Sequence, residues 1–181
     1  MLDGEEKLIA RAIEGESSAF GLLYDYYQPK IYRFAVLRTG RREEAEDLTH
    51  QVFLHAWQRV GEYQFLGFPF SSWLYRIARN AIIDHYRTRR EASSVEDVDL
   101  QSHTNLERDT DMLLQMDRVR KAIASMRDEH QEVIIMRFVE ELSIKEVADA
   151  LDKTEGAVKL LQHRAMRELQ RTLDVERANN K

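Results

Sequence analysis

The segment from Phe70 to Arg90 constrains the fold most strongly, because its apolar residues recur with the period of a helix. They follow i, i+3, i+4, i+7, i+8 and i+11 spacing, which forms one buried stripe of an amphipathic helix. The stripe comprises Phe70, Trp73, Leu74, Ile77, Ala78 and Ala81. A second face of the same helix collects Arg76, Arg79, Asn80, Arg87 and Arg90. Aromatic rings beside arginines suit single-stranded nucleic acid, which needs stacking surfaces and phosphate partners together. A solvated basic face on an ordinary core helix is the alternative interpretation.

The remainder of the chain also has a helical pattern. The whole chain of 181 residues includes only 7 Gly and 2 Pro, and no run alternates as a strand would, so we predict an all-α protein. The chain has no cysteine, which excludes disulfides, thiolate metal sites and a cysteine nucleophile and fits a reducing compartment. The N-terminus is too charged for a signal peptide, and no apolar run approaches the roughly 18 residues of a membrane span. We therefore expect a soluble, cytoplasmic protein without membrane insertion.

The net charge of −5 is concentrated in one segment of the chain. Residues 1–90 and residues 118–181 each carry 13 basic and 12 acidic side chains, whereas residues 91–117 carry one arginine against eight acids. Within that acidic stretch, residues 91–111 have few apolar side chains and no sustained period, which predicts a flexible acidic linker. A plain solvated spacer is the alternative. The two flanking parts remain free to carry local basic faces.

Periodicity and end signals predict four helices on each side of this linker. Gly15 and Gly40 are placed to end the first two helices, and Pro29 should kink or break the second near Tyr27. The expected helices cover residues 4–14, 17–38, 42–59, 70–90, 112–126, 129–139, 144–151 and 155–173.

The last two of these helices have the spacing of a helix-turn-helix. Ser143 and Glu146 form a capping box, Asp152 begins a short turn, and Thr154 can cap a longer, basic second helix. In that geometry the N-terminal part of the second helix enters the major groove of DNA. Its outward residues are expected to be Thr154, Glu155, Lys159, Gln162 and His163, with Arg164 and Arg167 reaching phosphates. An ordinary helical hairpin is the alternative.

Four stretches in this order resemble the extracytoplasmic-function sigma factors, the smallest members of the primary-sigma family of bacterial RNA polymerase. They are AEDLTHQVFLHAW (45–57), FSSWLYRIARNAIIDH (70–85), QEVIIMRFVEELSIKEVADAL (131–151) and TEGAVKLLQHRAMREL (154–169). The resemblance implies a promoter-specific transcription-initiation factor with two helical domains. Residues 1–90 would be sigma region two, residues 91–111 the linker and residues 112–181 sigma region four.

The resemblance also assigns partners and site residues. RNA polymerase core would bind through its beta-prime clamp helices and beta flap, and the clamp helices would contact Asp47, Leu48, Gln51, Val52 and Phe53. Minus-ten promoter DNA would contact Tyr63, Arg76, Arg79, Asn80 and Arg87, with Tyr63 cradling a flipped base. The second helix of the helix-turn-helix would read the minus-thirty-five element. Sigma factors of this kind are commonly held by an anti-sigma factor, which adds a candidate partner.

Residues near these positions refine the expectation. The loop GEYQFLGFP (61–69) holds three aromatics, and we expect Phe65 or Phe68 to cover the core and to leave Tyr63 for DNA. The sequence also departs from the family at three places. His50-Gln51 replaces a common Gln-Glu pair, Glu141 replaces a usual glycine, and Leu160-Leu161-Gln162 replaces a small-basic-apolar pattern in the reading helix.

Three other function classes compete with a sigma factor. An enzyme is disfavoured because His50 and His55 do not share a helix face and no glycine-rich phosphate loop is present, so we expect no catalytic residue, metal or cofactor. A helix-turn-helix regulator that binds duplex operators remains the alternative. Such a regulator shifts duplex DNA unaided, whereas a sigma factor of this type needs core polymerase. A helical bundle that only binds other proteins is the third alternative, and it would not explain the two basic faces.

Overall fold

The structure is a computed structural model that describes residue 2 and residues 4–65, 68–92 and 118–179. Every regular element within these ranges is helical, which confirms the predicted all-α class. From residue 93 onward the predicted linker lies outside the described residues, as does the first part of the helix expected over residues 112–126.

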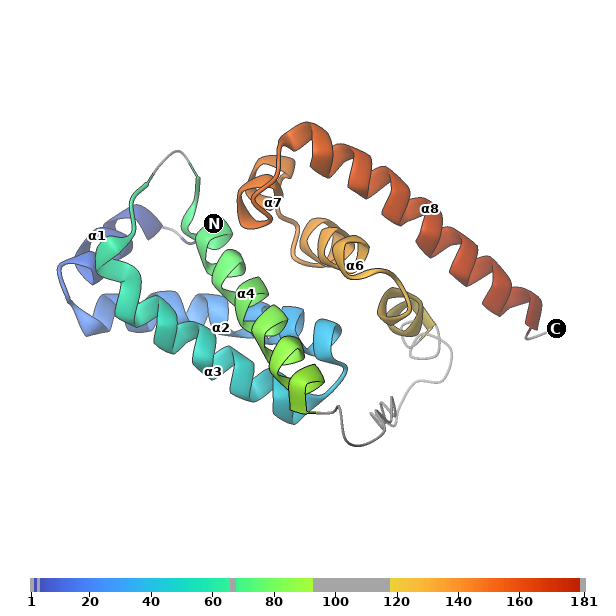
Figure 1. Cartoon of the computed structure of the whole chain (residues 1–181). Helices are drawn as coiled ribbons and strands as arrows, with labels where there is room; N and C mark the ends of the chain where they lie inside the picture. Colours follow the sequence, from blue (N-terminus) through green and yellow to red (C-terminus); the bar gives the residue numbers. More distant parts are fainter. Residues whose placement is uncertain (1, 3, 66–67, 93–117, 180–181) are drawn as a thin grey trace, which may run out of the picture.

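The N-terminal half forms a four-helix unit (Figure 1). Its elements are α1 (Glu5–Ile13), α2 (Ser17–Thr39), α3 (Arg42–Arg59), a short 3-10 turn η1 (Val60–Glu62) and α4 (Phe70–Ala92). Helix α2 packs against both α1 and α3, and α4 packs across α3 and α2. The core between them is built from fully buried Leu23, Ile31, Phe34, Leu48, Val52 and Leu74. All four helices begin and end within two residues of their predicted bounds.

The ends of α2 illustrate how local chemistry sets these bounds. Gly40 adopts φ 71 and its N–H donates to the Val36 carbonyl at 2.9 Å, which closes the helix as predicted. The predicted break near Tyr27 is wrong, because α2 continues through Pro29. Proline removes one helical hydrogen-bond donor, but Tyr27 and Ile31 on either side of it are buried in the core, and this packing stabilises the continuous helix.

The C-terminal half is a second helical unit. Residues 118–124 are helical and precede α6 (Asp128–Ile134), the π-helical turn η2 (Ile135–Val139), α7 (Ile144–Ala150) and α8 (Glu155–Asn179). Helices α6 and α7 both pack on α8 around buried Val133, Met136, Val147, Val158 and Ala165. The helix expected over 129–139 is present, but its last five residues widen into the π turn, and α8 runs six residues beyond its predicted end.

The two units contact each other directly. Helix α7 packs against the N-terminal part of α4, and η2 contacts α2 (Figure 1). Nothing in the sequence pattern predicted this contact, which covers part of the basic face of α4.

Candidate nucleic-acid interface

The polar residues predicted along α4 do not form one continuous free surface. Asn80 and Arg87 are exposed, and Arg87 pairs with Asp84 of its own helix at 3.2 Å. Arg76 instead forms an ion pair with Asp149 of α7, and Arg79 Nε lies 3.0 Å from Glu132 Oε2 of α6. The predicted basic face of α4 is therefore divided. Its C-terminal part faces solvent, and its N-terminal part faces the second unit.

Hydroxyl groups of α4 extend the same contact. Ser71 Oγ donates to Glu146 Oε1 at 2.8 Å, and Ser72 Oγ lies 2.7 Å from Asp149 Oδ2. Tyr75 is buried and its hydroxyl donates to Glu140 Oε2 at 2.9 Å. Burial, reinforced by the adjacent Glu140 carboxylate, raises the pKa of Tyr75 well above its usual range. These three residues were not predicted, because their partners lie 65–77 positions away in the sequence.

Two arginines of α2 complete the contact, and no local pattern singled them out. Arg33 binds Glu140 with two parallel bonds, from Nε and Nη2, each 2.7 Å long. Arg38 has a side chain only 2% exposed and donates from Nη1 to Gln131 Oε1 at 2.5 Å. Its Nη2 lies 3.8 Å from Glu132, the carboxylate that also pairs with Arg79. A fork-shaped guanidinium suits such bidentate and shared carboxylate contacts.

The aromatic loop after α3 corrects one expectation. Tyr63 is 8% exposed, its ring packs against Phe70 and Trp73, and its hydroxyl donates to the Phe68 carbonyl at 3.2 Å. Burial raises the pKa of Tyr63 to about 12. Phe65 is 66% exposed. The prediction that Phe65 or Phe68 covers the core and leaves Tyr63 free is therefore wrong for Tyr63 and Phe65. Tyr63 reaches the aromatic cluster of α4 and satisfies its hydroxyl there.

Helix α3 separates its expected polymerase contacts into two sets. Asp47 and Gln51 are exposed, whereas Leu48, Val52 and Phe53 are buried against the rest of the first unit. In this structure those three side chains belong to the core, and Asp47 and Gln51 are the members of the set that face outward. On the outward face, Leu54 and Trp57 remain accessible, which the sequence analysis missed. The position of Leu54, seven residues after Asp47 on the same face, was the available signal.

The helix-turn-helix has the local geometry that its sequence predicts. The Glu146 N–H donates to Ser143 Oγ at 3.2 Å and the Ser143 N–H to Glu146 Oε2 at 2.8 Å, which completes the capping box. The turn passes through Asp152 at φ 53, and Thr154 Oγ1 accepts from the Ala157 N–H at 3.2 Å. Both predicted caps are confirmed.

The outward side of α8 matches the expected reading face at most positions. The exposed members are Thr154, Glu155, Lys159, His163, Arg164 and Arg167. Gln162 differs, because it is only half-exposed and its Oε1 accepts from Arg137 Nε at 3.0 Å. Val158 and Ala165 face the core, as their spacing predicts.

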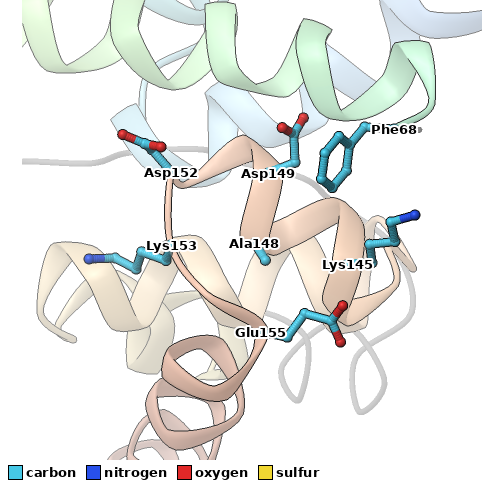
Figure 2. A pocket seen from close by; sticks show the side chains of 7 residues that line it. All are labelled: Phe68, Lys145, Ala148, Asp149, Asp152, Lys153 and Glu155. Carbon is cyan, nitrogen blue, oxygen red and sulfur yellow. The ribbon is translucent and has the colours of Figure 1, made fainter. Parts of the chain in front are cut away.

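A pocket of about 330 Å³ lies where the first unit meets the turn of the helix-turn-helix (Figure 2). Phe68 from the aromatic loop stands beside Asp149 and Lys145 of α7, and the Lys145 Nζ lies 5.1 Å from the centre of the Phe68 ring. Asp152 and Lys153 line the opposite part, and Glu155 completes the lining below Lys145 in this view. The mixed charges of this lining single out no ligand.

Among residues 4–65, 68–92 and 118–179, no group of three or more His, Asp or Glu side chains is placed to hold a metal ion. Among the helices described, none combines the length and the apolar character needed to cross a membrane.

One unit with an arginine-lined helix and a second with a capped helix-turn-helix define a two-domain helical DNA-binding protein. Comparison with known families agrees: residues 23–92 match sigma-70 region 2, and residues 122–171 match sigma-70 region 4.

Individual relatives agree as well. The chain is 38% identical over 175 residues to the ECF RNA polymerase sigma factor BldN of Streptomyces coelicolor, covering 92% of this chain and 65% of BldN. It is 30% identical to the ECF RNA polymerase sigma factor SigL of Mycobacterium tuberculosis, covering 91% and 94% of the two chains. CnrH, solved in complex with the cytosolic domain of CnrY, superposes with a TM-score of 0.74 at 25% identity, covering 94% of this chain and 97% of CnrH. The chain belongs to the ECF RNA polymerase sigma factors. An operator-binding regulator that acts without polymerase is not favoured.

Proposed function

We propose that this sigma factor divides promoter recognition and opening among three surfaces, on α3, on the α4 region and on α8. The observation that carries the proposal is the capped helix-turn-helix in the same chain as the arginine-lined α4, in the order of sigma regions two and four. The domain bounds we propose are residues 1–90 and 112–181, with the acidic segment 91–111 as the linker between them.

The α3 surface is proposed to bind the clamp helices of RNA polymerase core. Support comes from the exposed polar pair Asp47 and Gln51 and from the neighbouring accessible apolar side chains of Leu54 and Trp57. Exposed apolar side chains rimmed by polar residues are typical of protein-binding surfaces. Buried Leu48, Val52 and Phe53 would act by holding this helix face in place.

The α4 region is proposed to bind the opened minus-ten strand. Asn80 and Arg87 are exposed, and the side chains of Arg76 and Arg79 become available for phosphates once their carboxylate partners leave. In the adjoining loop, Phe65 presents its ring to solvent without rearrangement, so we assign it the stacking role first expected of Tyr63. Base flipping costs a few kcal/mol of unstacking, which such a ring and phosphate contacts offset.

The α8 surface is proposed to read the minus-thirty-five element in the major groove. Thr154 and Glu155 lie at the start of the helix, where a recognition helix contacts base edges. Lys159, Arg164 and Arg167 follow on the exposed side and suit phosphate contacts.

The remaining features of the proposal concern partners and setting. The beta flap of polymerase is the expected second contact on core, and an anti-sigma factor is a further expected partner. The role requires no catalysis by the chain itself and places it in the cytoplasm with the polymerase.

Transcription in vitro with purified core polymerase and a promoter library tests the proposal. We expect specific transcripts only when both the chain and core are present, and no shift of duplex promoter DNA by the chain alone. A specific duplex shift without polymerase, together with no transcription in its presence, would instead indicate an operator-binding regulator.

A further inference from the structure

Arg137 joins three segments of the second unit through one guanidinium group. It belongs to the π turn η2, and its Nε donates to Gln162 Oε1 of α8 at 3.0 Å. Its Nη1 donates to the carbonyl of Leu142, directly before the cap of α7. Short π-helical turns occur frequently at functional sites. The start of α7 and the first part of α8 are therefore bound to the same side chain.

The chemistry of this contact fixes the orientation of the Gln162 amide. A guanidinium has N–H donors and no acceptor, so the Gln162 atom that faces Arg137 must be the carbonyl oxygen. The amine at Nε2, which carries two donor hydrogens, then points away from Arg137. Gln162 is half-exposed, and no hydrogen bond among the described residues engages its amine. The amine is therefore available to an acceptor outside the chain.

The position of Gln162 along α8 places this amine at the edge of the reading helix. Glu155, Lys159 and Gln162 follow i, i+4 and i+7 spacing, so they share one stripe of α8. Glu155 and Lys159 are exposed on the side that we propose reads the minus-thirty-five element. DNA offers hydrogen-bond acceptors to such a stripe on base edges in the major groove and on phosphate oxygens.

We propose that Arg137 is a positioning residue for recognition of the minus-thirty-five element. It holds Gln162 so that the amine of the amide faces promoter DNA, where it donates to an acceptor on a base edge or a phosphate. Without this contact the amide could turn and present its oxygen to DNA instead. The inference rests on the function proposed for α8, and it adds a residue outside the helix-turn-helix that acts on this surface through Gln162.

An isosteric substitution separates the two ends of the amide. Gln162→Glu keeps an oxygen toward Arg137, where the bond becomes charge-assisted, but it removes both donor hydrogens. We expect the melting temperature of the full chain to be unchanged or higher. Binding of the chain with core polymerase to a promoter fragment from the transcription library should become roughly tenfold weaker. Gln170→Glu adds the same charge at an exposed position of α8 and should bind as the wild type does.

Equal promoter binding by Gln162→Glu and the wild type would overturn the inference. So would an equal loss in Gln162→Glu and Gln170→Glu, because net charge alone would then explain it. Lys159→Ala and Arg164→Ala separate this failure from failure of the proposed function. If they weaken promoter binding and Gln162→Glu does not, only the inference is wrong. If none of the three weakens binding, the reading role of α8 is wrong as well.

A double-mutant cycle assigns the part played by Arg137. Arg137→Ala should weaken promoter binding in the wild-type background and have no further effect in Gln162→Leu, which has no amide to orient. Equal losses in both backgrounds would show that Arg137 acts only through the Leu142 carbonyl. A salt slope lowered by about one unit would show that Arg137 itself binds a phosphate. Either result would overturn the inference. If Arg137→Ala does not fold, Gln162→Glu still decides, because it keeps both bonds of Arg137.

The DNA identifies the acceptor. For a base edge, Gln162→Leu should relax the preference at one base pair of a randomised minus-thirty-five element. For a phosphate oxygen, the loss should be uniform across sequences, and a methylphosphonate at one position should weaken binding of the wild type but not of Gln162→Leu. The absence of both patterns would overturn the inference.

Discussion

Replacing Glu141 by glycine should stabilise the chain, although it removes a side chain. Glu141 adopts φ 58, between the π turn and the capping box of α7, and its side chain is exposed. A non-glycine residue pays about 1–2 kcal/mol in the left-handed region. Glycine avoids that cost, but it loses more backbone conformational entropy on folding, which costs about 0.5–1 kcal/mol. The expected net gain is about 0.5–1 kcal/mol, which corresponds to about 1–4 °C in the melting temperature of a chain of this size.

Two matched variants decide whether backbone strain is the cause. Glu141→Ala removes the same carboxylate but keeps Cβ, so it should give no gain. Asp152→Gly relieves φ 53 at the helix-turn-helix turn, but aspartate tolerates this region better than glutamate, so its gain should be smaller. Urea unfolding and thermal melting of the full chain provide the measurement. A Glu141→Ala variant as stable as Glu141→Gly would show that charge removal, and not the backbone, accounts for the effect.

The other predictions concern the proposed surfaces. Asp47→Arg should weaken association with core polymerase and leave the melting temperature unchanged, because the side chain is exposed; undiminished co-purification with core would contradict the α3 assignment. Phe65→Ala should leave formation of the closed promoter complex unchanged but should disfavour opening of the promoter DNA by roughly 1–3 kcal/mol, which permanganate footprinting of the bubble would detect. Tyr63→Ala, in contrast, should lower the thermal stability of the protein, since the Tyr63 ring is part of the core. If the promoter bubble formed normally with Phe65→Ala, the stacking role would return to Tyr63. In the presence of core polymerase, Lys159→Ala and Arg164→Ala should each reduce the salt dependence of promoter-duplex binding by about one unit of slope if each contacts one phosphate, measured as log affinity against log salt; an unchanged slope would remove that residue from the interface.

Local pattern was sufficient to predict the bounds of the four helices of the first unit and the caps of the helix-turn-helix, but not the π turn or the end of α8. The apolar stripe of α4, the glycine after α2 and the capping box of α7 each depend on residues within a few positions of one another, and such short-range chemistry is legible in a sequence. The same holds for the exposed side of α8, apart from Gln162, because the burial of Val158 and Ala165 fixes which side faces solvent.

Contacts between distant segments were not predictable in this way. The choice between Tyr63 and Phe65 for the core depends on the positions of Phe70 and Trp73 in space, which spacing alone does not supply. The partners of Arg76 and Arg79 lie 73 and 53 residues away, so their engagement by the second domain has no local signature. The continuation of α2 through Pro29 likewise reflects tertiary packing that outweighs a local propensity.

Glu140 connects the contact between the two units to the start of the helix-turn-helix. Its carboxylate joins Arg33 and Tyr75 of the first domain, and it lies between the π turn and the start of α7, three residues before Ser143. Replacement of Glu140 should therefore weaken the contact between the two units and also disturb the short segment that leads into α7. One side chain thus connects the packing of the first unit to the backbone that begins the helix-turn-helix.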